Sequence, residues 1–330
     1  MEPFGFYKGK NVTVTGGLGF LGSNIARRLV ALGSRVTVVD CILEGHGGNP
    51  FNLDGVLDKV TWVKGDICNR PLMQNVLKNQ DLLFNIAAQT SHTDSMKNPS
   101  LDAEINIKGQ INILEICREL NPAIKIVYCS TRAVYGATGK TIIDEETNPN
   151  PLDIYSVDKL AGEFYHQIYC RVYGLNTTVL RLANGYGPRA QMANPSFGIL
   201  NWFIRLAIGN EDIKIFGDGK QVRDYTYIDD IVESFLIAGA SENLKGEVLN
   251  VGSGVGVPLI NIVKDVVRLA GKGNIVYVPW PETNKKIDVG DFIADVTKVK
   301  SKLSWAPKIS MEEGIKKTLE YYEAHKRNYW

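Results

Sequence analysis

Tyr155 and Lys159 stand four positions apart, a spacing that places a tyrosine and a lysine on one face of a helix. An ammonium beside a phenol stabilises the phenolate, so Tyr155 could act as a base near neutral pH although its ordinary pKa is about 10. The spacing alone is weak, because Tyr322 and Lys326 repeat it in a charged stretch that we interpret as solvated surface. The first pair differs in its position, near the edge of a predicted sheet where ligands bind.

Two hydroxyls, Ser130 and Thr131, lie where the predicted strand 124–130 ends. Either could hydrogen-bond the substrate oxygen that Tyr155 would deprotonate, and for each taken alone an ordinary strand-end hydroxyl is the alternative. His92 follows another predicted strand and could shape the substrate site or cap its own loop. The sequence therefore predicts an acid–base site at this edge without deciding between the two hydroxyls.

The glycine-rich segment 15–22 follows the predicted strand 11–15 and leads into a predicted helix. Gly16 would allow the tight turn, Gly19 would let a pyrophosphate approach the backbone, and Gly22 would let the helix pack on the strand. The open helix N-terminus would then receive the phosphates. The order of strand, loop, helix and second strand is the required context, and a glycine-rich turn without a ligand is the alternative.

Asp40 ends the second predicted strand. A carboxylate there accepts hydrogen bonds from ribose hydroxyls and repels a 2′-phosphate, which favours NAD over NADP. Asp66 follows the third predicted strand and could reach an adenine amino group, although a solvated turn is the alternative.

These residues require a framework of buried strands separated by helices. That alternation predicts an α/β, Rossmann-type, doubly wound parallel sheet with a smaller mixed α/β C-terminal lobe. We expect an NAD-binding domain over 1–180, to which 228–250 could return, and a substrate lobe over 181–330. The predicted strands are 11–15, 35–40, 60–64, 81–87, 124–130 and 177–182.

Composition excludes several other classes. The 330 residues include 37 basic and 36 acidic side chains, so a net charge of +1 favours neither nucleic acid nor an anionic membrane as a partner. No apolar run is long enough to span a bilayer, and the start lacks a secretion-signal pattern. Five cysteines without a Cys-x-x-Cys pair and four scattered histidines predict no metal site and suit a cytoplasmic protein.

Taken together, the motifs resemble the extended short-chain dehydrogenase/reductases and, more narrowly, their NAD-dependent nucleotide-sugar epimerase/dehydratase branch, which is typified by UDP-glucose 4-epimerase. The resemblance covers nearly the whole chain. The segments that carry it are 15–22, 65–67, 87–88, 130–131, 134–136, 155–159, 180–188, 216–225 and 228–230, together with Asp40.

The resemblance implies a role for each matching position. Thr131, Tyr155 and Lys159 would form the catalytic set, and Asn184 and Arg223 would hold the diphosphate of the sugar nucleotide. The residues that would bind NAD are Gly16, Gly19, Phe20, Leu21, Gly22, Asp40, Asp66, Ile67, Ala87, Ala88 and Lys159.

The residues after Thr131 bear on the reaction. Dehydratases of this branch carry an Asp-Glu pair there and the related decarboxylases usually keep the glutamate, whereas this chain has Arg132 and Ala133. The resemblance therefore favours an isomerase (EC 5.1.3), most simply a UDP-hexose 4-epimerase that forms a transient keto-sugar and recycles bound NAD.

Several alternatives stay open at this point. The segment 130–136 also resembles the CDP-tyvelose 2-epimerases, so inversion at another carbon of a CDP- or dTDP-sugar is one of them. A dehydratase or decarboxylase, a keto-sugar reductase and a non-catalytic NAD sensor are the others. Lys285 and Lys286 stand where many 4-epimerases have an arginine, so the way the protein binds the diphosphate could differ.

Two apolar helical stretches, 101–119 and 155–173, are expected to lie side by side on one face of the sheet. Related enzymes pair this face between subunits, which predicts a homodimer. A monomer with an apolar face is the alternative.

Overall fold

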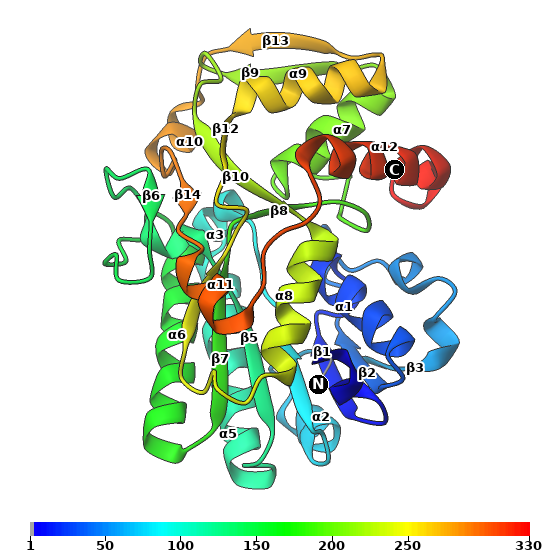
Figure 1. The fold of residues 1–330 in the computed structure, drawn as a ribbon, viewed down its shortest axis with the longest axis vertical. Helices are drawn as coiled ribbons and strands as arrows, with labels where there is room; N and C mark the ends of the chain where they lie inside the picture. Colours follow the sequence, from blue (N-terminus) through cyan, green and yellow to red (C-terminus); the bar gives the residue numbers. More distant parts are fainter. Residues whose placement is uncertain (1–2) are drawn as a thin grey trace.

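A seven-stranded parallel sheet forms the larger lobe of the computed structural model, which describes residues 3–330 (Figure 1). All its neighbouring strands run parallel, and the expected strands are present within two residues at either end. The predicted α/β, Rossmann-type fold is therefore confirmed. In spatial order the strands are β11 (Val248–Val251), β7 (Asn176–Leu182), β5 (Lys125–Thr131), β4 (Leu82–Asn85), β1 (Asn11–Thr15), β2 (Arg35–Asp40) and β3 (Val60–Lys64).

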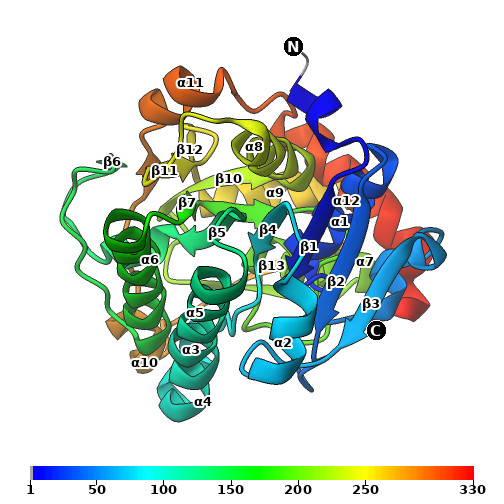
Figure 2. The same ribbon diagram turned by 90° about the horizontal axis from the view of Figure 1, so that it is seen from below.

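Helices cover both faces of this sheet (Figure 2). The central strands are rich in Val, Ile and Leu and are buried on both faces, as a covered parallel sheet requires. One face carries α1 (Phe20–Ala31) and α8 (Ile228–Ala240), which pack on each other, and the other carries α2 (Arg70–Leu77), α5 (Gly109–Leu120) and α6 (Ile154–Tyr173).

The strand order reverses between β1 and β4. From β1 the chain builds outward through β2 and β3, then returns to the other side of β1 to form β4 and β5. Loops that leave the carboxyl ends of β1 and β4 therefore diverge, and in open α/β sheets such a switch point is where ligands bind.

The smaller lobe lies over the carboxyl ends of the sheet (Figure 1). It contains three small sheets, in the orders β12-β10-β8, β13-β9 and β14-β6, and these join segments far apart in the sequence. Its strands are β6 (Ile142–Ile143), β8 (Asn184–Tyr186), β9 (Asp212–Phe216), β10 (Val222–Tyr227), β12 (Gly256–Pro258), β13 (Asn274–Val278) and β14 (Ile293–Ala294). The remaining helices of the chain are α3 (His92–Lys97), α4 (Pro99–Ala103), α7 (Ile199–Gly209), α9 (Leu259–Ala270), α10 (Glu282–Lys286), α11 (Thr297–Leu303) and α12 (Met311–His325).

The chain crosses between the lobes several times. Residue 180 lies inside β7, α8 packs on α1, and β11 adds the outermost strand beside β7. The segment α11 also packs on β11 and α8. The domain boundary at residue 180 stays a prediction. The contacts of α8 and β11 support the prediction that residues 228–250 return to the NAD-binding domain.

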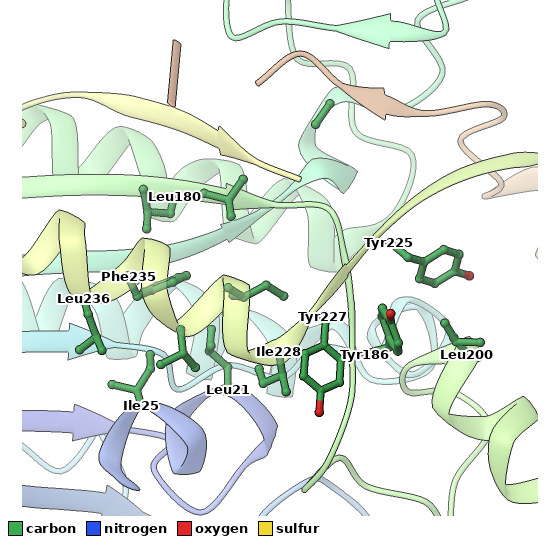
Figure 3. Close-up of a cluster of buried hydrophobic side chains, with 14 of the residues drawn as sticks. Leu21, Ile25, Leu180, Tyr186, Leu200, Tyr225, Tyr227, Ile228, Phe235 and Leu236 are labelled. Atoms are coloured by element: carbon green, nitrogen blue, oxygen red, sulfur yellow. The ribbon is translucent and has the colours of Figure 1, made fainter. Parts of the chain in front are cut away.

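One hydrophobic core continues from the sheet lobe into the smaller lobe (Figure 3). Leu21 and Ile25 of α1 face Ile228 and Phe235 of α8 within this cluster. The core then passes from α8 to Tyr186 in the small sheet. Burial of this continuous apolar surface holds the two lobes against each other.

Two local expectations differ from the structure. The helix expected over 101–119 is divided into α4, a π-helical turn (Glu104–Lys108) and α5. Tyr322, interpreted as solvated surface, is fully buried in α12, and its hydroxyl donates to the Ala190 carbonyl at 3.0 Å. That expectation was wrong, because the rings of Tyr329 and Trp330 fold back and pack against Tyr322.

Candidate active site

A deep pocket opens at the carboxyl ends of the sheet strands, at the switch point between β1 and β4. It is lined by every residue that the resemblance assigned to NAD and by the three assigned to catalysis. These residues are Gly16, Gly19, Phe20, Leu21, Gly22, Asp40, Asp66, Ile67, Ala87, Ala88, Thr131, Tyr155 and Lys159.

The glycine-rich turn between β1 and α1 has the shape that a bound pyrophosphate needs. Gly16 has a φ of +65°, and a Cβ there would lie 2.9 Å from the Cα of Ala87. A Cβ on Gly22 would lie 2.2 Å from the carbonyl oxygen of Gly16, so helix and turn touch only because this residue is glycine. Gly19 precedes α1 and caps it with no side-chain hydrogen bond, which leaves the positive end of the helix open.

The Asp40 carboxylate is fixed at the end of β2. One oxygen accepts from the Leu18 N–H at 3.0 Å and the other from the Ile42 N–H at 2.9 Å. Burial raises the pKa of Asp40, and these two backbone hydrogen bonds act in the opposite direction. Asp66 is exposed and accepts from the Cys68 N–H at 2.8 Å, whereas Ile67 is buried. The pocket thus presents a carboxylate at each of two neighbouring strand ends.

The first two turns of α6 place Tyr155 and Lys159 in the lining of the pocket. The Asp153 carboxylate caps the helix by accepting from the Ser156 N–H at 2.8 Å, and the Tyr155 N–H donates to Ser95 Oγ at 3.1 Å. The Lys159 Nζ lies 4.2 Å from the centre of the Tyr128 ring. These contacts fix both functional side chains in the pocket wall.

Both ionisable groups of this pair are buried, and burial opposes the charged form of each. It raises the pKa of Tyr155 well above its ordinary value and lowers the pKa of Lys159 to about 8. A hydrogen bond with Thr131 acts against the effect of burial on Tyr155. Burial thus opposes formation of the Tyr155 phenolate, and the assignment of Tyr155 as the base stays a prediction.

Thr131 and Ser130 point to different partners, as successive residues of a strand do. The Thr131 hydroxyl hydrogen-bonds Tyr155 and accepts from the Ala133 N–H at 3.2 Å. The Ser130 hydroxyl instead donates to Glu163, which is held in a buried ion pair with Arg181 at 2.7 Å. In this structure Thr131 has the hydroxyl that meets Tyr155.

Asn184 and Arg223 lie beside the pocket and do not line it. Arg223 is 8% exposed, and its guanidinium donates to Asp288 at 2.6 Å and to the Gly290 carbonyl at 2.5 Å. The Asn184 amide donates to the Asp224 carbonyl at 2.8 Å. Both side chains are therefore held by protein contacts, and the chain neighbours of Asn184, Ala183 and Gly185, line the pocket.

Several pocket residues were not found from the sequence. The loop after β2 contributes Leu43 and His46, and the loop before α7 contributes Gln191 and Phe197. The rings of His46 and Phe197 lie 5.6 Å apart, so the two loops meet over the pocket. No local pattern marks these residues, because the contact joins segments about 150 positions apart in the sequence.

His92, for which the sequence left two roles open, lies against the catalytic tyrosine. Its Nδ1 is 2.7 Å from Asp153 Oδ2, and its ring meets the Tyr155 ring edge-on with 5.0 Å between centres. The imidazole thus supports both the cap of α6 and the position of Tyr155.

Neither a metal centre nor a membrane-spanning helix is found within residues 3–330. No group of three or more His, Cys, Asp or Glu side chains in that range is arranged to hold a metal ion. No helix in the same range is both long enough and apolar enough to cross a membrane.

Comparison with known proteins shows which family and which relatives this chain resembles. Residues 12–252 match the NAD dependent epimerase/dehydratase family. A putative UDP-glucose 4-epimerase of Methanocaldococcus jannaschii is 32% identical over 320 residues, which cover 96% of this chain and 99% of that protein. A CDP-paratose 2-epimerase of Salmonella typhi is 30% identical, and the match covers 93% of this chain and 98% of that protein.

A solved structure agrees over nearly the whole chain. The UDP-glucose 4-epimerase of Thermotoga maritima, with UDP-glucose, superposes with a TM-score of 0.88 at 35% identity. The match covers 96% of this chain and 99% of that one. Both lobes therefore have counterparts in this relative.

Proposed function

The chain belongs to the NAD-dependent epimerase/dehydratase family, and from that premise we propose that it epimerises a nucleotide-diphosphate sugar, most simply a UDP-hexose at carbon 4. The observation that carries the proposal is the meeting of Thr131 and Tyr155 above Lys159 in the same pocket as the glycine-rich turn. A cofactor site alone would not require these three side chains to be in one place.

The proposed reaction assigns one task to each side chain. Tyr155 takes the proton of the sugar hydroxyl that is oxidised and returns it when the ketone is reduced. Thr131 hydrogen-bonds the same oxygen, and Lys159 is the cation that the chain supplies to stabilise the phenolate. NAD, held by the glycine-rich turn, would supply a reversible hydride acceptor for this oxidation and reduction. Because the hydride is returned, no second substrate is needed.

The residues that would hold NAD are assigned from their places in the pocket. The open N-terminus of α1 would receive the pyrophosphate, and Asp40 would accept from the adenosine ribose. Asp66 and Ile67 would flank the adenine, and Ala87 and Ala88 would flank the middle of the dinucleotide. The close contact between Gly16 and Gly22 supports this assignment, because it keeps side chains away from the phosphates.

The residues after Thr131 favour epimerisation over loss of water. Elimination needs an acid near the sugar, and the next two positions hold Arg132 and Ala133, of which Ala133 is buried. The same absence weighs against a decarboxylase of the related type. Inversion at another carbon, as the name of the Salmonella relative describes for that protein, is the second candidate, and the segment 130–136 favours it.

For the sugar nucleotide we propose Asn184 and Arg223 as contacts at the diphosphate. Arg223 is buried and directed by Asp288, which would orient its planar guanidinium toward a phosphate. Lys286 is paired with Glu282 at 2.8 Å and exposed on α10, so its contribution would be a diffuse positive charge.

The test is incubation of the purified protein with UDP-, dTDP-, GDP- and CDP-sugars, followed by NMR of the products. The proposal expects an inverted sugar with no net formation of NADH. Loss of water or CO₂, or no turnover of any sugar nucleotide, would overturn it. A keto-sugar reductase would consume NADH in proportion to product, which the absorbance at 340 nm separates from a recycled cofactor.

A further inference from the structure

Arg132 lies beside the pocket and forms no ion pair within the described residues. Its Nε donates to Asn184 Oδ1 at 3.2 Å, and its guanidinium carbon lies 5.3 Å from the centre of the Phe292 ring. Its Nη1 is shielded from solvent and has no hydrogen-bond partner among those residues. Burial lowers the pKa of Arg132 to about 10, as expected of a desolvated cation. A shielded N–H on a charged group is costly, which indicates a missing partner.

The carboxylates nearest to Arg132 are bonded elsewhere. Asp288 accepts from Arg223 at 2.6 Å. Asp224 accepts backbone N–H groups from Ser253 at 2.8 Å and from Gly254 at 3.1 Å. Arg223 adds a second positive charge that disfavours the charged form of Arg132. The protein therefore concentrates cationic groups here and leaves one of them without a counter-ion.

A second shielded donor faces the same place from the smaller lobe. The Tyr225 hydroxyl is buried without a hydrogen-bond partner in the described structure. Burial raises the pKa of Tyr225 to about 12, and the charges of Arg223 and Arg132 act against this rise. Tyr225 and Arg132 also share a neighbour, because Arg132 donates to the Asn184 side chain. Tyr225 pairs with Asn184 across β10 and β8, and its hydroxyl points away from Ile228 (Figure 3).

The place of Arg132 in the chain indicates which part of a substrate it meets. It directly follows Thr131, which lines the pocket with Tyr155, so its backbone lies at the reacting end of the site. It bonds Asn184, whose chain neighbours Ala183 and Gly185 line the pocket. A planar guanidinium with a free N–H matches the geometry of a carboxylate, and a phenol hydroxyl can donate to the same group.

We propose that Arg132 and Tyr225 bind a carboxylate carried on the sugar of the substrate, so that the protein prefers a nucleotide-linked hexuronate to the neutral hexose. This specificity rests on the proposed function, since it concerns the substrate of the same site. Arg132 is then a specificity-determining residue, and Thr131, Tyr155 and Lys159 remain the catalytic set.

The test compares UDP-glucuronate, UDP-glucose and UDP, with binding measured by calorimetry and turnover by NMR. The wild-type protein should bind UDP-glucuronate at least about tenfold more tightly than UDP-glucose. Arg132→Gln should weaken UDP-glucuronate by about 10- to 100-fold, the range of a charge-assisted hydrogen bond, and leave the other two within about threefold. Tyr225→Phe removes only a hydroxyl and should cause a smaller loss of affinity, restricted to UDP-glucuronate. This variant provides the test if Arg132→Gln does not fold.

Arg205→Gln is the matched control. Arg205 also has a shielded N–H without a partner among the described residues, and it stacks on the Trp202 ring at 4.6 Å outside the pocket lining. This variant should keep the preference for UDP-glucuronate. The control isolates the general effect of losing a partly buried arginine.

Three results would overturn the inference. The first is a wild-type protein with no preference for the charged sugar. The second is an Arg132→Gln variant that weakens the binding of UDP as much as that of UDP-glucuronate, which would assign the anion to the diphosphate. The third is that both arginine variants behave alike. Binding does not require turnover, so these results differ from a failure of the proposed function, in which no sugar nucleotide is epimerised whatever its charge.

Discussion

At the scale of single residues, the neighbouring hydroxyls of Ser130 and Thr131 are expected to serve different purposes, stability for Ser130 and catalysis for Thr131. Replacing Thr131 by Val keeps the shape of the side chain and removes the hydroxyl that meets Tyr155, so kcat should fall by about 100-fold or more with little change in Tm. Replacing Ser130 by Ala removes a donor to buried Glu163, so stability should fall by about 1 kcal/mol while turnover persists. Kinetics and thermal melts of both variants check this reversal, and equal losses of kcat would contradict it.

Tyr155 offers a sharper test at the same scale. Tyr155→Phe removes the proton-transfer group and keeps the buried ring against His92, so turnover should fall by about 1000-fold or more. Cofactor binding should persist, because the glycine-rich turn and Asp40 are untouched. NMR of the product and the NAD content of the purified variant measure the two effects separately. Activity that survives this change would show that the base is another residue.

Asp158, one position before Lys159, gives a pH dependence of stability. It is buried, and burial together with a hydrogen bond to Asp102 raises its pKa to about 7. The folded state therefore holds a proton that the unfolded chain releases near pH 4, so this contribution is complete below about pH 4 and is lost as pH rises through about 7. The variant Asp158→Asn should not lose this contribution to stability as the pH rises. The difference in Tm, variant minus wild type, should therefore be about 2 °C larger at pH 8 than at pH 5.5. If the Tm values of the two proteins changed in parallel across this pH range, the raised pKa of Asp158 would be contradicted.

At the scale of helices and strands, the sequence was informative where a segment is determined locally. The β-branched runs of β1, β2 and β3 and the glycines after β1 predicted both the sheet and its phosphate-binding turn. The pairing of β14 with β6 could not be predicted, because two-residue strands about 150 positions apart have no periodicity of their own. For the same reason the Asp288 partner of Arg223 and the Glu163 partner of Ser130 emerged only from the folded structure.

The outer face of α6 presents an apolar stripe that fits the proposed homodimer. Val157, Phe164, Ile168 and Val172 are exposed at spacings that place them on one face of this helix. Phe164→Glu should bury a charge in the subunit interface and convert a dimer into a monomer. Val255→Glu, an equally exposed apolar residue in a loop, is the control and should leave the mass unchanged. Light scattering after size-exclusion chromatography measures both, and a wild-type monomer would refute the proposal.

At the scale of the whole molecule, a buried polar network joins α6 and β7 to β11, the outermost strand of the sheet. Arg181 of β7 pairs with Glu163 of α6 and donates to the Tyr135 hydroxyl at 2.9 Å. That hydroxyl donates in turn to Asn250 of β11 at 2.7 Å. Every member is buried, so the network resists partial opening, and the hydrophobic core beside it continues into the smaller lobe. The two lobes should therefore not melt separately.

This coupling predicts how NAD changes the stability of the molecule. Cofactor at about 100 times its Kd should raise the free energy of unfolding by about 2.7 kcal/mol, because it binds only the folded state. With a core that continues between the lobes, calorimetry of cofactor-free protein should show one transition, and NAD should move the whole of it upward by about 5 °C. Gly22→Ala should lose most of this shift, since its Cβ would lie 2.2 Å from the Gly16 carbonyl oxygen and would force the phosphate-binding turn open. Two transitions, of which NAD moves only one, would show that the lobes unfold independently despite their shared core.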